Sequence, residues 1–162
     1  MNNHVITFSH KQVAVQCFNK VWDLLEKDDR TNLEDEEMVH MCHTSFWHWT
    51  QVEDHTEQNL SIGYWQLSRV YAMVGNGEQA LEYAQRCIAV SIDAKLAPFY
   101  IAYAYEAMSR AYTILKQKEQ AQKCLELANE YTKSVIVEES KKLLKNDLKE
   151  LMRLMDTTFS KN

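Results

Sequence analysis

A fourteen-residue segment occurs twice in the chain, and this repeat constrains the fold more than any other feature. Residues 67–80 read LSRVYAMVGNGEQA, and residues 108–121 read MSRAYTILKQKEQA, 41 positions later and without a gap. Ser, Arg, Tyr, Glu, Gln and Ala are identical at matching positions. Self-similarity at such a period is typical of stacked helical units, because a single unit cannot bury its apolar face alone. The repeat predicts an architecture, and it does not predict a ligand.

Composition limits the class of protein. The 162 residues contain three Gly and one Pro, which leaves few places for hairpin turns and favours an all-α chain of about one domain. A net charge of −5 argues against nucleic-acid and anionic-membrane partners, which need a cationic surface. Neither a signal peptide nor an apolar stretch of about 18 residues is evident. We therefore expect a single cytoplasmic domain over 1–162, without a membrane segment.

The four cysteines are widely spaced and lie in apolar helical patterns. They are Cys17, Cys42, Cys87 and Cys124, and no Cys-x-x-Cys pair occurs among them. A chain of this size can hold a core without disulfide bonds, so we expect buried free thiols in a reducing compartment.

Apolar residues at helical spacing predict about seven helices. Ser9 with Gln12 forms a capping-box pattern for the first helix, and Asn32 is expected to cap the second. The clearest repeats cover 60–94 and 99–131, each with two helices. A last helix over about 137–155 is apolar on one side and lysine-rich on the other, as expected of a terminal capping helix.

The spacing of small and aromatic residues resembles the tetratricopeptide repeat. In that family, helix A carries Leu, a small residue and Tyr at positions 0, +1 and +4, and helix B carries two small residues seven apart. The matching residues are Leu67, Ser68, Tyr71, Ala80 and Cys87, and then Met108, Ser109, Tyr112, Ala121 and Ala128. The resemblance implies a tetratricopeptide-like α-solenoid of about three helix pairs plus a C-terminal capping helix, with residues 9–55 as the first pair only by analogy.

This chain departs from the family in three ways. Its period is 41 rather than 34 residues, Ala84 or Leu125 stands where helix B carries an aromatic residue, and the closing Pro is absent. The chain also resembles a group of small bacterial proteins of this type, through His48-Trp49, Asn59, 68–71, 86–87 and 104–107. That likeness implies a bacterial cytoplasmic protein and carries no activity.

The resemblance also implies a partner-binding concave face lined by helix A of each repeat. Its predicted binding residues are Trp65, Arg69, Tyr103, Glu106 and Arg110. Two guanidiniums beside aromatic walls can hold a carboxylate bidentately, which predicts a non-enzymatic scaffold for a protein or peptide partner. In the alternative interpretation, Arg110 pairs with Glu106 four residues earlier and Arg69 is solvated. We expect Arg69→Ala with Arg110→Ala to abolish capture without lowering the melting temperature.

A histidine-rich segment supports a different function class. Glu36, His40 and His43 share one helical face, and imidazoles with a carboxylate suit zinc or iron, so the alternative function is a small metal-dependent helical enzyme. Solvated or hydrogen-bonded histidines remain the other interpretation, because one helix rarely closes a metal site. No nucleophile elbow occurs, and Gly75-Asn76-Gly77 is interpreted as a turn because no strand is expected before it, so we assign no catalytic residue and no cofactor. A homodimer that buries Trp22 and Trp47 is a further hypothesis.

Overall fold

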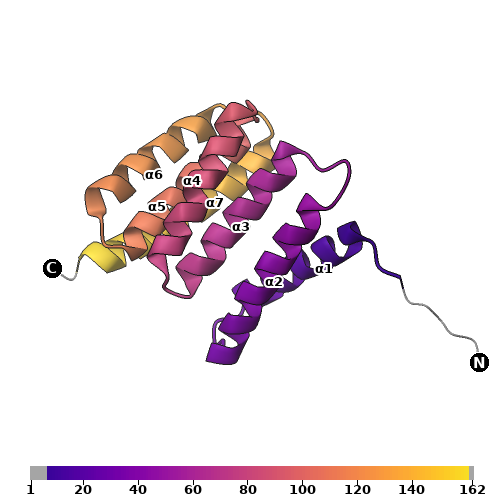
Figure 1. Cartoon of the computed structure of the whole chain (residues 1–162). Coiled ribbons are helices and arrows are strands. Elements are labelled where there is room, and N and C mark those ends of the chain that lie inside the picture. Colours follow the sequence, from indigo (N-terminus) through magenta and orange to yellow (C-terminus); the bar gives the residue numbers. More distant parts are fainter. Residues whose placement is uncertain (1–6, 161–162) are drawn as a thin grey trace, which may run out of the picture. The chain divides into compact units, whose positions relative to one another are not determined.

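The computed structural model describes residues 7–160, and this part of the chain folds into seven α-helices without a strand (Figure 1). They are α1 (His10–Leu25), α2 (Asn32–Thr50), α3 (Glu57–Met73), α4 (Gly77–Asp93), α5 (Pro98–Ile114), α6 (Lys118–Lys133) and α7 (Glu138–Phe159). The all-α prediction is therefore confirmed for the described residues. Among them, no helix has both the length and the apolarity needed to cross a bilayer.

The chain divides into two compact units, Met1–His55 and Thr56–Asn162. The first unit contains α1 and α2, which a short loop joins as a helical hairpin. The second unit contains α3 to α7. The expectation of one domain over 1–162 stays a prediction.

Reciprocal capping sets the helix starts in the first unit. Ser9 accepts from the backbone N–H of Gln12 at 3.1 Å, and Gln12 accepts from the Ser9 N–H at 2.9 Å, which confirms the predicted capping box. The predicted cap of α2 at Asn32 is wrong by one residue. Thr31 is the cap, because Glu34 lies three residues after it and closes a second reciprocal pair.

The closed end of this hairpin is held by charged side chains. Arg30 Nη1 donates to the carbonyl of Leu24 in the last turn of α1 at 3.0 Å and to the carbonyl of Lys27 in the loop at 2.7 Å. Arg30 Nε donates to Asp35 Oδ1 in the first turn of α2 at 2.7 Å. Helix ends leave carbonyls without intrahelical partners, so Arg30 stabilises the end of α1 and the start of α2 together.

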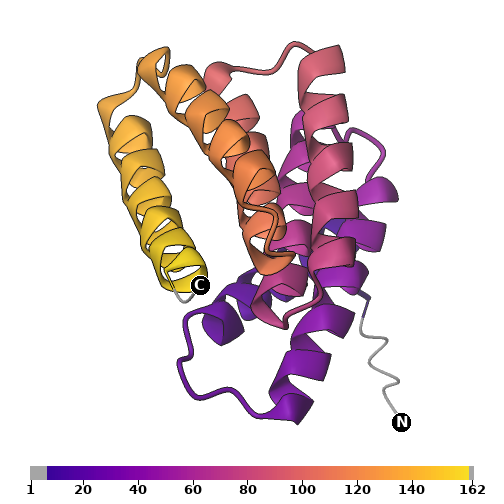
Figure 2. The same cartoon turned by 90° about the vertical axis from the view of Figure 1, so that its left-hand side faces the viewer.

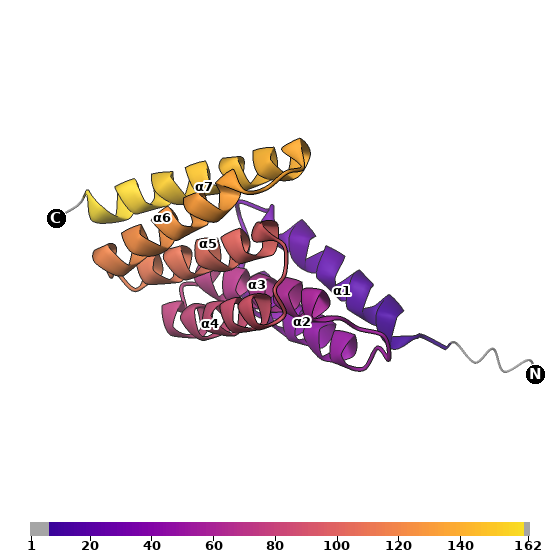
Figure 3. The same ribbon diagram turned by 90° about the horizontal axis from the view of Figure 1, so that it is seen from above.

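In the second unit, each helix packs against its neighbour in the chain, and the first helix of each pair also packs against the first helix of the next pair. Contacts join α3 to α4, α4 to α5 and α5 to α6; α3 also contacts α5, and α7 contacts both α5 and α6. Figure 2 shows α6 and α7 side by side, and Figure 3 shows α5 between α3 and α7. The helix α7 therefore adds a third layer to two helical pairs.

The sequence repeat is also a repeat of hydrogen bonds. Ser68 Oγ donates to the carbonyl of Ala80 at 2.7 Å, and Ser109 Oγ donates to the carbonyl of Ala121 at 2.8 Å. All four residues are buried. A small side chain lets the two helices of a pair approach closely, and its hydroxyl is satisfied by a backbone carbonyl across the contact.

The turns inside the two pairs are alike as well. Asn76 N–H donates to Tyr71 O, and Gln117 N–H donates to Tyr112 O, each at 2.9 Å. The residue before each donor has a positive φ, 81° at Gly75 and 59° at Lys116. These are the marks of a Schellman-type helix end, in which glycine is favoured. Lys116 adopts the same conformation despite its side chain.

Some helix boundaries differ from the sequence prediction. The helix expected from residue 60 begins at Glu57, because Thr56 forms a capping box with Asn59. Pro98 is the first residue of α5, as predicted. The last helix extends to Phe159, beyond the expected end near residue 155, and Phe159 packs on the α6–α7 core.

All four cysteines are free, as predicted. Cys42, Cys87 and Cys124 are buried, whereas Cys17 is half-buried. Burial raises the pKa of the Cys87 thiol to about 12, which keeps it protonated and unreactive.

Candidate binding site

The five residues predicted to bind a partner come together in one polar cluster within the second unit. Trp65 and Arg69 lie on α3, and Tyr103, Glu106 and Arg110 lie on α5. Their positions follow from the close packing of these two helices. The sequence therefore predicted that these five side chains lie together, and their role in binding a partner stays a prediction.

Glu106 is the centre of the cluster. Arg110 donates to Glu106 Oε1 from Nε at 2.9 Å and from Nη2 at 2.6 Å. Trp65 Nε1 donates to Oε2 at 3.0 Å, and Arg69 Nη1 lies 3.4 Å from Oε1. Both carboxylate oxygens thus have donors, as a buried charge requires.

The depth of the cluster differs from the expected open groove. Glu106 is 0% exposed and Arg110 is 6% exposed, so neither forms a surface contact. The Arg69 side chain is 16% exposed and pairs with Glu106, so it is not simply solvated. We expected that Arg69→Ala with Arg110→Ala would leave the melting temperature unchanged, which requires exposed side chains. The burial of Arg110 contradicts this requirement.

Charge compensation keeps Glu106 ionised. Burial alone raises the pKa of a carboxyl group, but Arg110, Arg69 and the Trp65 hydrogen bond outweigh it and hold the pKa of Glu106 below its usual value. Burial and the like charge of Arg110 lower the pKa of Arg69, and Glu106 opposes them. Arg69 Nε is buried without a hydrogen-bond partner.

The helix α7 extends the cluster through Asp147. The Tyr103 hydroxyl donates to Asp147 Oδ2 at 2.6 Å, and the Trp65 and Tyr103 rings meet edge to face with centroids 5.3 Å apart. Burial raises the pKa of Asp147, while the Tyr103 bond opposes the rise. The sequence prediction did not include Asp147. Trp65, Glu106 and Asp147 nevertheless follow one another at intervals of 41 residues, the period of the repeat.

The histidine segment of the first unit does not form the alternative metal site. His40 Nε2 lies 3.7 Å from Glu36 Oε1, and both side chains are largely exposed. Burial, followed by the nearby His40, lowers the pKa of His43. Within residues 7–160 no group of three His, Cys, Asp or Glu side chains is arranged to hold a metal ion.

The homodimer hypothesis concerned two tryptophans of the first unit. Trp47 is 54% exposed, and its ring contacts His10 and His48. The ring of Trp22 lies edge to face against Phe18 at 6.5 Å. A dimer through these residues stays a prediction.

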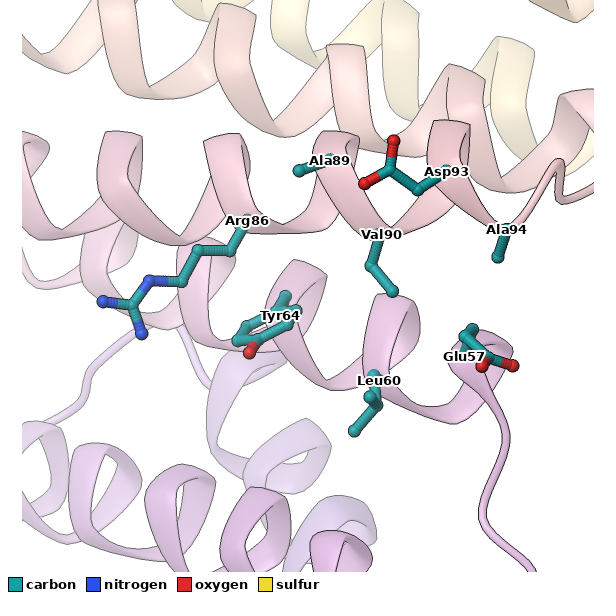
Figure 4. A pocket seen from close by; sticks show the side chains of 8 residues that line it. All are labelled: Glu57, Leu60, Tyr64, Arg86, Ala89, Val90, Asp93 and Ala94. Carbon is teal, nitrogen blue, oxygen red and sulfur yellow. The ribbon is translucent and has the colours of Figure 1, made fainter.

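A shallow groove that the sequence did not predict lies between α3 and α4 (Figure 4). Its volume is about 510 Å³, and its apolar lining includes Leu60, Tyr64 and Val90. Glu57 and Asp93 mark one end and Arg86 the other. Arg86 forms an ion pair with Glu82 and lies 5.3 Å from the Tyr83 ring centroid, so its charge is already compensated.

Comparison with known proteins gives no family for this chain. No protein-family model matches it, and no curated protein matches its sequence significantly. The class of protein is therefore defined by the fold, as an all-α chain whose second unit contains two matching helical pairs and a further helix.

Proposed function

We propose that the second unit is a short tetratricopeptide-like α-solenoid with α7 as its capping helix. The matching Ser–carbonyl bonds and turn bonds of the two pairs support this assignment. The packing of α7 on both α5 and α6 supports its place as the next helix A. The helices α1 and α2 form a further helical hairpin in the first unit.

We further propose that the protein is a non-enzymatic scaffold that binds a peptide at the polar cluster. The single observation that carries this proposal is the position of Arg69, whose side chain is partly exposed whereas Glu106 and Arg110 are buried. A partly exposed guanidinium group is suited to bidentate contacts with a carboxylate.

The roles of the two arginines differ in this proposal. Arg110 is committed to Glu106 through two short bonds and holds that carboxylate in place. Glu106 in turn orients Arg69 and does not repel a ligand carboxylate, because its charge is compensated within the cluster. Arg69 is thus the binding residue, and Glu106 and Arg110 position it.

The charges around Arg69 indicate the kind of peptide. Glu106, Asp147 and Glu150 all act on Arg69 electrostatically, and the latter two come from α7. A peptide that presents a carboxylate to Arg69 and a basic side chain towards α7 matches both signs. The rings of Trp65 and Tyr103 offer an apolar surface beside them, as peptide-binding hot spots commonly do.

The test is affinity capture with single arginine variants. We expect Arg69→Gln to lose the captured partner, and Arg69→Lys to retain only part of it, because lysine keeps the charge without the planar fork. Arg86→Gln is the matched control, since Arg86 is an exposed arginine on α4 outside the cluster. Capture that is unchanged in Arg69→Gln would refute the assignment, provided circular dichroism shows that the variant is folded.

A further inference from the structure

Two histidines meet at the open end of the first-unit hairpin. His10 is the first residue of α1, and His48 lies in the last turn of α2. Their Nδ1 atoms are 2.8 Å apart, and their ring centroids are 5.0 Å apart. The loop that joins the two helices, with Arg30, lies at the opposite end of the hairpin.

We propose that His10 and His48 form a binding site for a divalent transition-metal ion, with Nδ1 of each imidazole as a ligand. Metal–imidazole bonds of about 2.0–2.1 Å at a right angle place the two nitrogens roughly 2.9 Å apart. The observed separation of 2.8 Å therefore matches the spacing of two adjacent ligands on one ion. Nickel and copper fit this right angle best, because both take square-planar or tetragonal geometry with imidazole ligands.

The exchange of a hydrogen bond for a metal ion needs no net loss of a proton. Between two neutral rings at this separation, one Nδ1–H donates to the Nδ1 lone pair of the other. When the donor ring carries its proton on Nε2 instead, both Nδ1 lone pairs are available to the ion. The exposed position of His10 gives the ion access from solvent.

Trp47 holds the pair from one side. Its ring meets the His10 ring at a centroid distance of 5.6 Å and the His48 ring at 4.9 Å, both nearly edge to face. No third His, Cys, Asp or Glu joins them within the described range of the chain, so water completes the coordination. The ion would bridge α1 and α2 and would therefore stabilise the hairpin on binding.

The test is a titration with Ni²⁺, which does not exchange electrons with the free cysteines. The protein is purified without an affinity tag and in a His4→Gln background, because His4 lies outside the described residues. Binding is measured by calorimetry and by quenching of tryptophan fluorescence at pH 7.5. We expect His10→Gln and His48→Gln each to weaken Ni²⁺ binding at least tenfold.

The control histidines lie on the same hairpin. We expect His40→Gln with His43→Gln to bind Ni²⁺ within twofold of the background protein, and Trp47→Phe to bind it with much less quenching. Ni²⁺ should raise the melting temperature of the background protein and leave that of His10→Gln unchanged. Binding that survives His10→Gln, or that disappears in the His40 and His43 variant, would overturn the proposal. Because His10 is exposed, His10→Gln should not disturb folding, and it therefore tests the metal site even if His48→Gln affects folding.

Discussion

The indole N–H of Trp65 donates to the carboxylate of Glu106, which occupies the same position one repeat later in the sequence. Matching positions of the two repeats are thus joined directly by a polar bond. Arg69 and Arg110 are related in the same way and share the same carboxylate oxygen. The two helical pairs are therefore coupled through one buried charge as well as through apolar packing.

Removal of that charge should destabilise the second unit strongly. In Glu106→Gln, the buried guanidinium of Arg110 and the partly exposed one of Arg69 lose the carboxylate that compensates them, and breaking a buried ion pair costs roughly 3–5 kcal/mol. Urea denaturation measures the loss. The control is Glu82→Gln, which removes an exposed ion pair with Arg86 and should change the free energy of unfolding by less than about 1 kcal/mol. Equal effects of the two substitutions would contradict the central role of Glu106.

The two serine bonds should contribute equally. Ser68→Ala and Ser109→Ala each remove one buried hydrogen bond to a carbonyl, and we expect each to lower the free energy of unfolding by about 1 kcal/mol. Thermal or urea unfolding of both single variants checks this. A large loss in one variant and none in the other would show that the two pairs are not built alike.

Gly77 should be intolerant of a side chain. A Cβ at this position would lie 2.7 Å from Leu115 Cγ, where α4 begins against the end of α5. We expect Gly77→Ala to cost roughly 1–3 kcal/mol by overpacking, despite the better helix propensity of alanine. In the double variant Gly77→Ala with Leu115→Ala, the loss in the free energy of unfolding should be smaller than the sum of the losses in the two single variants. A more stable Gly77→Ala variant would show that Leu115 moves aside without cost.

Glu34 should contribute to the acid sensitivity of the first unit. Its hydrogen bond with Lys27, followed by that with the Thr31 N–H, lowers the pKa of Glu34 from 4.5 to about 2. Because the folded pKa is the lower one, the stabilising contribution is complete above about pH 4.5 and is lost as the pH falls towards 2. Between these values, Glu34→Gln should lose stability with acidification less steeply than the wild type. Parallel curves by circular dichroism would contradict this role.

Local signals allowed much of the fold to be predicted. Residues at helix starts, such as the cap Ser9 and the first-turn residue Pro98, act within one helical turn, so their effect can be predicted from neighbouring residues. The same locality explains the error at Asn32, where the better pairing of Thr31 with Glu34 decided the cap. The repeat period correctly predicted that Arg69 and Arg110 lie near each other, because equivalent positions of adjacent pairs lie side by side.

Burial and long-range partners were less predictable. The depth of Glu106 depends on how closely α3, α5 and α7 pack, which no single segment encodes. Asp147 could have been found by extending the 41-residue period once more into the last helix. The meeting of His10 with His48 depends on the register of α1 against α2, whereas helical spacing within one segment grouped His40 and His43 with Glu36.

The most direct test of the account is quantitative affinity capture with wild type, Arg69→Gln and Arg86→Gln in parallel, each shown to be folded by its unfolding curve. The proposed peptide-binding role of the cluster predicts that wild type and Arg86→Gln capture the same partner in equal amounts, and that Arg69→Gln captures at most a tenth of it. Equal capture by all three proteins would contradict the account.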